Sequence, residues 1–223
     1  MTSHVLIDIG NTLVKMRSGN KVQQFFLDEF SEALVPNKEK VWVSDVTSMN
    51  FFTHKDNINY ASTQKNYKHL VNTYKPYESL GVDRWMALIA AYEITHTDNF
   101  VVIDIGTAVT IDIVQKNVFY GGLIMPGLNK LLTSFVFANN RDIKNKNFLE
   151  NDTHACWNSG CYFLLLDSLN TRVSFIKKNI NEDIQIFITG GGARNFMDEF
   201  DFKYSYYENL VLDGLELYAH NMG

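Results

Sequence analysis

The 223-residue sequence contains little of what marks several special classes of protein. Its two cysteines, Cys156 and Cys161, make neither a CxxC pair nor a disulfide framework, and its six histidines show no metal-ligand spacing. Only three prolines are present, which excludes long proline-rich linkers, and no apolar run approaches the length of a membrane span. These shortages argue against disulfide-stabilised, zinc-binding and membrane-spanning classes.

Positive charge is scarce as well. Lysine and arginine number 20 against 25 aspartates and glutamates, so the net charge is −5. General nucleic-acid binding needs a basic surface, whereas one phosphorylated small molecule needs only backbone N–H groups and one or two cations. The chain begins Met-Thr-Ser-His and enters an apolar run at once, without the regions of a signal peptide. We therefore expect a cytoplasmic protein that binds neither nucleic acid nor a membrane.

Apolar patterning predicts strands and helices in an order that occurs twice. The first half predicts strands at 5–9, 13–16, 22–30 and 40–46, a mixture of helix, strand and loop over 47–76, and a helix at 83–95. The second half predicts strands at 100–105, 109–114 and 118–122, a helix at about 127–138, a polar loop at 139–158 and a helix at 162–176. It then predicts a strand from 184 into a glycine-rich turn at 190–192, a further helix, a strand near Leu210 and a C-terminal helix. This alternation is typical of the α/β class.

The four-residue sequence Ile-Asp-Ile-Gly occurs at 7–10 and again at 103–106, each time at the end of an apolar run and before small polar residues. The two copies stand almost half a chain apart, which indicates a domain-sized duplication rather than a short solenoid repeat. We therefore predict two tandem lobes, at 1–98 and 99–223.

The first copy opens the segment 8–15, Asp-Ile-Gly-Asn-Thr-Leu-Val-Lys, whose residue types suit a phosphate-binding hairpin. Gly10 lets the backbone approach a ligand closely, Lys15 can reach an anion at the turn, and Asp8 can orient a magnesium ion directly or through water. A structural β-turn with a surface lysine is the alternative interpretation.

Two further turns of small residues follow apolar strands, at 104–108 and 189–193. Asp104 and Thr107 in the first of them can hold a cation or a phosphate, although this turn lacks a counterpart of Lys15. Three such turns suggest one nucleotide held between two lobes. The sequence contains neither the Walker pattern GxxxxGK[ST] nor GxGxxG, which argues against a Rossmann dinucleotide site.

Asp83 and Arg84 follow Gly81 at the start of the helix predicted for 83–95. Beside the guanidinium group we expect the carboxylate of Asp83 to keep a low pKa and to accept a proton from an attacking hydroxyl, largely by orienting that nucleophile. Arg84 can form paired hydrogen bonds with a substrate carboxylate or with a phosphoryl group. A helix-capping aspartate followed by a solvated arginine is the alternative interpretation.

Taken in order, these motifs resemble those of the type III pantothenate kinases, a branch of the acetate and sugar kinase/Hsc70/actin superfamily. The resemblance covers almost the whole chain and rests on five segments: DIGNTLVK at 8–15, GVDR at 81–84, DIGTA at 104–108, GGLIMPGL at 121–128 and TGGGA at 189–193. It implies an α/β fold with two ribonuclease H-like, actin-like lobes. It also implies ATP-dependent phosphorylation of the primary hydroxyl of pantothenate, the first step of coenzyme A synthesis. One departure is LLTSFVFANNRD at 131–142, which lacks the Leu-Pro that the family usually carries there.

The resemblance also implies a role for individual residues. Asp83 is implied as the general base, Asp104 as the ligand of an activating K⁺ or NH4⁺, and Thr107 as an ATP contact. The residues implied to hold the ATP phosphates and Mg²⁺ are Asp8, Ile9, Gly10, Asn11, Thr12, Leu13, Val14 and Lys15. Those implied to line the pantothenate site are Tyr74, Gly81, Val82, Asp83, Arg84 and Thr153. The family is dimeric, so a homodimer with the pocket near the subunit interface is expected.

Two other functions remain as alternatives. Another enzyme of the superfamily, such as a sugar kinase or a polyphosphate phosphatase, is usually a longer chain, and Gly-x-Asp-Arg argues against it. A catalytically silent relative could act as a regulatory binding protein. Such a relative need not keep every charged site residue, whereas this sequence has Asp8, Lys15, Asp83 and Asp104.

Overall fold

The computed structural model describes two compact units, and each is considered by itself. The first comprises Met1–Asp98, Val114–Gly121 and Asn209–Gly223, and the second comprises Asn99–Ile113 and Gly122–Glu208. The described residues are 4–47, 49, 51–53, 55–95, 97–135, 146–181 and 183–222. The lobes predicted at 1–98 and 99–223 stay a prediction; the units differ from them in assigning the C-terminal segment to the first unit.

The first unit contains a five-stranded sheet in the order β3-β2-β1-β4-β5. Its strands are β1 (Val5–Ile9), β2 (Leu13–Ser18), β3 (Lys21–Phe26), β4 (Val41–Asp45) and β5 (Ile58–Tyr60). Strands β1 to β3 form an antiparallel meander, whereas β4 is parallel to β1 and β5 is parallel to β4. The tight turns of the meander follow from Gly10-Asn11-Thr12 and Gly19-Asn20, residue types that reverse a chain easily.

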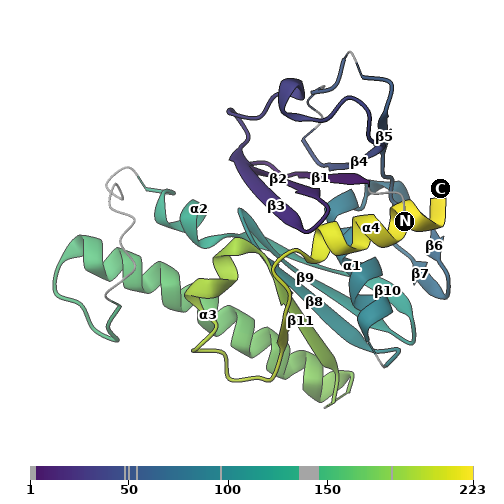
Figure 1. The fold of residues 1–223 in the computed structure, drawn as a ribbon. Helices are drawn as coiled ribbons and strands as arrows, with labels where there is room; N and C mark the ends of the chain where they lie inside the picture. The colour runs from purple at the N-terminus through teal and green to yellow at the C-terminus, as the bar shows by residue number, and fades with distance from the viewer. Residues whose placement is uncertain are drawn as a thin grey trace. The chain divides into compact units, whose positions relative to one another are not determined.

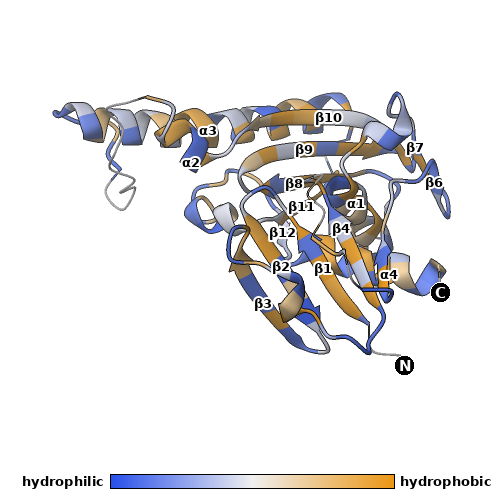
Figure 2. Ribbon diagram, turned by 90° about the horizontal axis from the view of Figure 1, so that it is seen from above, coloured by the Kyte–Doolittle hydropathy of each residue, from blue (hydrophilic) through white to orange (hydrophobic). Residues whose placement is uncertain are grey.

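The two faces of this sheet carry different partners. Because successive side chains alternate in direction, Val5, Ile7 and Ile9 lie on one face, in a core that includes Phe30 and Phe52. Hydrophobic residues prevail along β1 in Figure 2. Trp42 has the opposite direction and packs edge-to-face on Tyr218, with ring centroids 5.6 Å apart. The opposite face of the sheet is therefore covered by helical segments.

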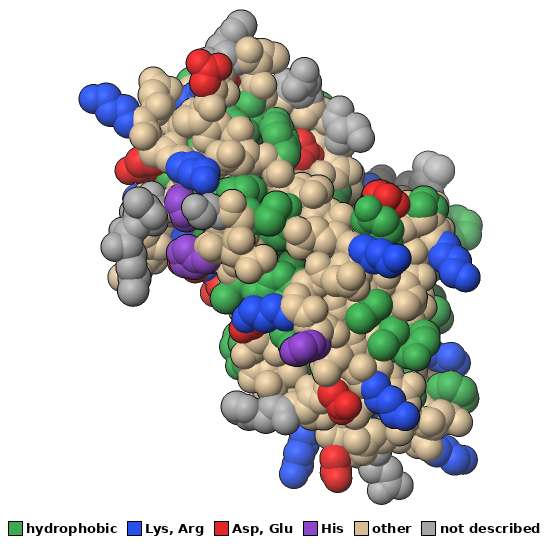
Figure 3. All heavy atoms as spheres, turned by 90° about the vertical axis from the view of Figure 1, so that its right-hand side faces the viewer, with side chains coloured by type: hydrophobic (Ala, Val, Ile, Leu, Met, Phe, Trp, Pro, Cys, Tyr) green, Lys and Arg blue, Asp and Glu red, His purple; other side chains and the backbone are tan. Residues whose placement is uncertain are grey.

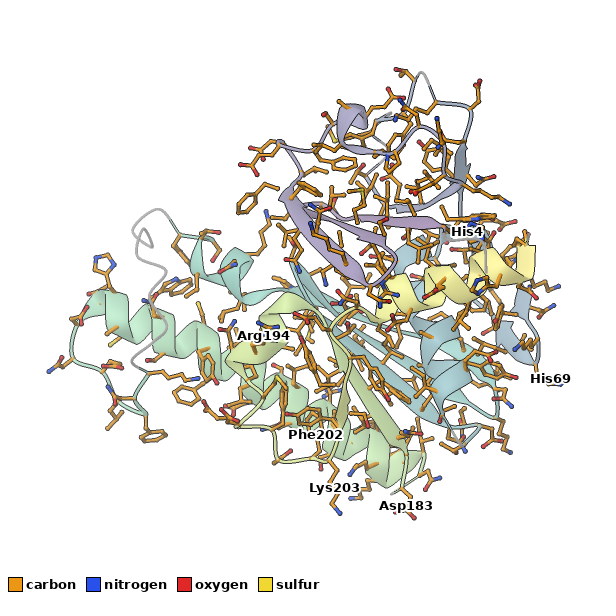
Figure 4. The ribbon with its side chains drawn as sticks, in the orientation of Figure 1. His4, His69, Asp183, Arg194, Phe202 and Lys203 are labelled. Carbon is orange, nitrogen blue, oxygen red and sulfur yellow. The ribbon has the colours of Figure 1, made fainter. Side chains whose placement is uncertain are left out.

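Those helices are α1 (Val82–Ile94) and α4 (Leu210–Met222), which lie side by side in Figure 1. Their backbones approach closely at Gly214, where a Cβ atom would stand 1.8 Å from the carbonyl oxygen of Met86. An ion pair of 2.6 Å between Arg17 of β2 and Asp213 ties α4 to the sheet. His4, which is labelled in Figure 4, lies just before β1. Its ring packs on that of His220 near the end of α4, with ring centroids 5.9 Å apart.

A seven-stranded sheet has the order β12-β11-β8-β9-β10-β7-β6. Its strands are β6 (Asn66–Tyr67), β7 (Leu70–Asn72), β8 (Phe100–Ile105), β9 (Ala108–Gln115), β10 (Val118–Pro126), β11 (Gln185–Thr189) and β12 (Ser205–Tyr206). The order β10-β9-β8-β11-β12 repeats the order β3-β2-β1-β4-β5 of the first sheet. As in that sheet, the strand that carries the Ile-Asp-Ile-Gly copy, β8, pairs in parallel with the strand on its far side, β11. The duplication predicted from the repeated sequence is thus visible in the strand order.

The second unit contains helices α2 (Leu128–Leu132) and α3 (Thr153–Asn179). One side of α3 buries Tyr162, Leu165, Leu169, Val173 and Ile176 in a core with β8, β9 and β11. The helix begins where the side chain of Asp152 accepts hydrogen bonds from the N–H groups of His154 and Ala155. Short 3-10 helices η1 (Glu32–Leu34), η2 (Tyr77–Ser79) and η3 (Gly191–Asn195) complete the described elements.

Two surface properties bear on function. Within the described residues, no helix combines the length and the apolar character that crossing a membrane requires. On the face drawn in Figure 3, acidic and basic side chains are interspersed. This distribution accords with the small negative net charge of −5.

Several predictions of local structure were wrong. Helix α3 begins at Thr153 within the segment expected to be a polar loop, and Leu210 begins α4, whereas the preceding strand lies at Ser205–Tyr206. Between 47 and 76 the described residues form β5, β6 and β7 and no helix. Strand β3 ends at Phe26 rather than at residue 30. The helix expected at 127–138 is found as Leu128–Leu132, and its last expected residues, 136–138, lie outside the described part of the chain.

Candidate functional site

The first predicted site element, the segment 8–15, is a β-hairpin formed by β1 and β2. Asp8 pairs with Lys15 across the hairpin, so the two side chains project from the same face. The turn is closed by a hydrogen bond of 3.0 Å from the Gly10 N–H to the carbonyl oxygen of Leu13. Asn11 and Thr12 at its tip are exposed. The hairpin therefore offers a carboxylate, an ammonium group and exposed turn residues at one end of the sheet.

Neighbouring strands and helix α4 fix this hairpin. Ser44 of β4 stands opposite Asp8 in the parallel register, and its side chain is fully buried. The Lys15 Nζ donates to Asn209 Oδ1 at 3.3 Å, just before α4 begins. Lys15 is therefore directed toward the N-terminal end of a helix, where the backbone dipole favours anions.

The second site element is the start of α1. Gly81 is the residue before the helix, and a Cβ atom there would lie 2.6 Å from the Asp83 Oδ1. The same carboxylate oxygen accepts a 2.7 Å hydrogen bond from the Arg84 N–H. A side chain at Gly81 would thus collide with the carboxylate in this position, which explains why the motif has a glycine two residues before the aspartate.

The pKa of Asp83 differs from the sequence-based expectation. Burial raises the pKa of this carboxyl above its usual value of 3.8, and the backbone hydrogen bond and the charge of Arg84 lower it by less. The expected low pKa was wrong because desolvation of the charged form outweighs the neighbouring guanidinium. A raised pKa makes Asp83 a stronger base toward a hydroxyl proton.

Tyr74 lies in the connection between β7 and α1, and its position is defined by several contacts. Its N–H donates to the Asn72 Oδ1 at 3.0 Å, and Asn72 is itself buried. Its ring stacks on Phe119 at 6.2 Å between centroids, and the Arg84 guanidinium carbon lies 5.7 Å from the centre of the Tyr74 ring. Arg84 is only 8% exposed, so the alternative of a solvated arginine is excluded.

A groove of about 620 Å³ lies beside this second element. Gly81 and Val82 form part of its lining, together with Asp45 at the end of β4 and the polar residues Ser62 and Thr63. The Thr63 Oγ1 donates to the carbonyl oxygen of Leu80 at 2.8 Å, which holds one wall to the segment that precedes α1. The groove gives a small polar molecule access to the backbone at the start of α1.

In the second unit the predicted turn 104–108 joins β8 to β9 and is enclosed by two other glycine turns. A Cβ atom at Gly190, where φ is +90°, would lie 2.3 Å from the Asp104 Oδ1 and 2.4 Å from the Ile105 oxygen. On another side, the Gly127 N–H donates to the Thr107 oxygen at 3.0 Å. The lack of a side chain at Gly190 therefore lets the backbone of this turn pack directly against the Asp104 carboxylate and the Ile105 carbonyl group.

The glycine turn after β11 is itself anchored by a cluster of charged and aromatic groups. The buried Tyr162 donates its hydroxyl to the Asn195 oxygen at 2.9 Å and to the Glu199 Oε1 at 2.7 Å. Lys146 forms an ion pair of 2.7 Å with the same Glu199 oxygen, and this contact lowers the pKa of Glu199. Arg194 projects from the same turn in Figure 4 and pairs with Glu208. The cluster fixes η3 to the core.

Thr153 is the first residue of α3 and is exposed. It lines a pocket of about 570 Å³ with Glu150, Asp152, Cys156 and Trp157. Glu150 in this pocket accepts hydrogen bonds from Asn147 and Ser159, so the loop before the helix is ordered by its own side chains.

The predicted site residues divide between the two units. The first unit holds the hairpin 8–15, Tyr74 and the segment 81–84, whereas Asp104, Thr107 and Thr153 belong to the second unit. Within the second unit, Asp104 and Thr107 share one turn, whereas Thr153 lies in a separate pocket that contains neither of them. The sequence prediction missed Asn72 and Phe119, because their importance comes from contacts with Tyr74 rather than from any motif.

Comparison with known sequences places these elements in a family. The family model described as type III pantothenate kinase matches residues 20–174. The type III pantothenate kinase of Hahella chejuensis is 38% identical over 168 residues, which cover 72% of this chain and 67% of that one. The type III pantothenate kinase of Alcanivorax borkumensis is 26% identical, with 96% of this chain and 98% of that one covered.

Comparison with solved structures concerns the fold. A Campylobacter jejuni protein named for the Baf family of transcriptional activators superposes with a TM-score of 0.67 at 21% identity, covering 98% of both chains. The apo pSK41 ParM protein superposes with a TM-score of 0.51 at 11% identity, covering 99% of this chain and 97% of that one. At these identities the likeness concerns the fold alone. Together with the repeated strand order, it confirms the predicted α/β fold of two ribonuclease H-like, actin-like lobes.

Proposed function

The chain belongs to the type III pantothenate kinase family, and from this premise we propose that it transfers the γ-phosphoryl group of ATP to the primary hydroxyl of pantothenate. The product is 4′-phosphopantothenate, and the reaction is the first step of coenzyme A synthesis. The matched segment 20–174 includes the start of α1, the turn at 104–108, the glycine turn at 127 and Thr153.

The observation that carries the proposal is the environment of Asp83. Phosphoryl transfer to an alcohol needs a group that accepts the hydroxyl proton and orients the oxygen for in-line attack. Asp83 is held in one position by the Arg84 N–H, has a raised pKa, and lies beside a groove that reaches Gly81 and Val82. Asp83 is the general base. Arg84 and Tyr74 bind the polar groups of pantothenate.

The hairpin 8–15 holds the phosphates of ATP in this proposal. Lys15 supplies one positive charge, and the exposed turn residues Asn11 and Thr12 supply backbone N–H groups near the dipole of α4. We assign to Thr107 a further contact with ATP. In phosphoryl transfer such groups act mainly by placing the γ-phosphorus and by stabilising the charge on its oxygens.

The proposal includes two cations. Kinases of this kind use ATP with a divalent metal, and Mg²⁺ is typically held by one or two carboxylates plus phosphate oxygens, a role that fits Asp8. Among the described residues no three His, Cys, Asp or Glu side chains form a metal cluster. The Asp104 carboxylate and the Ile105 carbonyl oxygen, which both lie close to Gly190, are the oxygen ligands that we assign to K⁺ or NH4⁺. When bound, the cations neutralise phosphate charge.

The proposal includes a cytoplasmic homodimer. An apolar surface on α3 and β10 supports the second copy as its partner: Ile124 is 62% exposed and Leu164 is 58% exposed. They line a groove of about 510 Å³. In a dimer the pantothenate pocket of one subunit is expected near the other, and Thr153 is assigned to bind pantothenate.

A direct assay tests the proposed function. The purified chain is incubated with ATP, Mg²⁺, K⁺ and pantothenate, and the product is identified by mass spectrometry. We expect 4′-phosphopantothenate and ADP in equal amounts. Replacing K⁺ by Na⁺ in the same assay is expected to weaken turnover. Absence of 4′-phosphopantothenate under the K⁺ condition would overturn the proposed function.

A further inference from the structure

Phe119 is a fully buried residue of β10 that contacts a proposed substrate residue without being accessible to substrate. It stands opposite Asn72 of β7 in the parallel register. Its ring is nearly parallel to that of Tyr74, with an interplanar angle of 14° and 6.2 Å between centroids. This is an offset-stacked pair, the arrangement that aromatic quadrupoles favour. The buried ring therefore fixes the plane of the Tyr74 ring.

The backbone around Phe119 fixes the same connection. The carbonyl oxygen of Phe119 accepts hydrogen bonds from the Thr73 N–H at 3.2 Å and from the Thr73 Oγ1 at 2.7 Å. Asn72, its register partner, binds the Tyr74 N–H through Oδ1 and donates from Nδ2 to the oxygens of Gln64 and Tyr77. Hydrogen bonds to neighbouring residues thus hold the main chain at Tyr74. The side chain of Phe119 contacts the Tyr74 ring and orients it.

Phe119 also affects Arg84, because Tyr74 contacts both residues. The Arg84 guanidinium carbon lies 5.7 Å from the Tyr74 ring centre, within the range of a cation–π contact. Because Arg84 is 8% exposed, its charge depends on such contacts to offset lost hydration. A change in the plane of the Tyr74 ring therefore alters the position of the guanidinium group.

We propose that Phe119 is a positioning residue for the acceptor substrate: its ring holds Tyr74, and through Tyr74 it holds Arg84, in the orientation that binds pantothenate. This inference rests on the proposed function. It assigns to Phe119 an effect on the affinity for pantothenate and none on ATP, because its contacts run to Tyr74 and not to the hairpin 8–15.

The test replaces the ring in two ways. Phe119→Leu shortens the side chain, and Phe119→Met keeps most of its volume without a flat face, so that at least one variant with an intact core is expected. Phe100→Leu is the matched control, since Phe100 is also fully buried but its ring contact is Phe187. Steady-state kinetics are measured with pantothenate and ATP varied in turn, and melting temperatures are recorded for every variant.

The expected result separates positioning from general destabilisation. Both Phe119 variants raise the KM for pantothenate about three- to tenfold, the range of one aromatic contact, with kcat and the KM for ATP within about twofold of the wild type. Phe100→Leu lowers the melting temperature without this selective change in KM. In a Tyr74→Ala background, Phe119→Leu changes the KM for pantothenate by less than about twofold, because the contact it acts through is already gone.

Failure of this inference is distinguishable from failure of the proposed function. Turnover by the wild type, with an unchanged KM for pantothenate in Phe119→Met, would overturn the role of Phe119 alone. A full additive effect of Phe119→Leu in the Tyr74→Ala background would also overturn it. No turnover by the wild type would overturn the proposed function and this inference together.

Discussion

At the scale of single residues, Asp83 is the group on which the proposed chemistry depends. The variant Asp83→Asn keeps the shape of the side chain and the oxygen that accepts the Arg84 N–H, but it cannot accept a proton. We expect kcat to fall at least about a hundredfold, the usual contribution of a general base. The measurement is initial velocity at saturating ATP and pantothenate. A variant with nearly normal turnover would remove Asp83 from this role.

We also expect Asp83→Asn to change the stability of the protein in a pH-dependent way. Because burial raises the pKa of Asp83, its carboxyl stabilises the fold fully below about pH 4 and loses that contribution as pH rises through the raised pKa. Asparagine stays neutral throughout, so we expect Asp83→Asn to melt at a higher temperature than the wild type at pH 7. The gap should close toward pH 4. Asp56→Asn, at an exposed aspartate of the same unit, is the control, and an equal gap in both variants would contradict the assignment.

The absence of a side chain at Gly81 leaves space for the carboxylate of Asp83. Its backbone angles, φ −53° and ψ 133°, are accessible to alanine, so Gly81→Ala introduces no backbone strain. The added Cβ would stand 2.6 Å from the Asp83 Oδ1 and must displace the carboxylate. Since a displacement of about 1 Å can slow an enzyme by up to a hundredfold, we expect kcat to fall roughly tenfold or more. The control Gly160→Ala adds a Cβ with nothing within 4 Å, and an equal loss there would refute the explanation.

At the scale of elements, sequence patterning located the strands of the two meanders better than the strands between 47 and 76 and the bounds of the helices. The run Phe100 to Ile105 is apolar along its whole length, which is typical of a strand buried on both faces, and it was predicted to the residue. The first turns of α3 were missed, because Asn158 and Ser159 are buried there and give no apolar signal. The start signal was present in Asp152, whose side chain caps the helix.

Helix α4 is a second element that local sequence patterning predicted poorly. The sequence predicts a strand near Leu210, whereas this residue begins α4, a helix that contains Gly214 although glycine disfavours a helix interior. The glycine is explained only by the neighbouring helix, since Met86 approaches it closely. Likewise the role of Asp83 was predicted from its motif, but its raised pKa depends on burial that a motif does not contain.

The close contact between α1 and α4 leads us to expect that a larger residue at Gly214 lowers stability. In Gly214→Ala the new Cβ would stand 1.8 Å from the Met86 oxygen, so the two helices must separate. Overpacking of this kind costs about 1–3 kcal/mol, although alanine is the better helix former. We expect a lower midpoint of denaturant unfolding for Gly214→Ala. Gly160→Ala, also within a helix but facing open space, should be neutral or stabilising, and a stabilised Gly214→Ala would contradict the close packing.

At the scale of the whole molecule, the duplicated strand order bears on the two roles proposed for one motif. Asp8 and Asp104 occupy the same place, near the end of the strand that begins each meander. Asp8 pairs with Lys15 across its hairpin, whereas Asp104 stands opposite Thr189 of β11 and lies next to glycine turns. A lysine favours phosphate, and a carboxylate among backbone oxygens favours a cation. The proposed division of roles thus follows from what surrounds each aspartate.

The proposed homodimer provides the last prediction, and it concerns the apolar surface on α3 and β10. Contiguous exposed apolar side chains on a protein surface commonly mark a contact, and two copies related by a two-fold axis would present this surface to each other. Ile124→Glu or Leu164→Glu would place like charges in such a contact twice. We expect either variant to be monomeric at concentrations at which the wild type is a dimer, as measured by light scattering after gel filtration.

A matched substitution separates this effect from a general loss of folding. Leu34 is 43% exposed in the first unit, so Leu34→Glu changes the charge equally and leaves the surface on α3 and β10 intact. We expect Leu34→Glu to remain dimeric. If the pantothenate pocket is completed by the second subunit, the monomeric variants should also bind pantothenate more weakly while keeping a folded circular dichroism spectrum. A dimeric Ile124→Glu variant with unchanged affinity for pantothenate would place the contact elsewhere on the molecule.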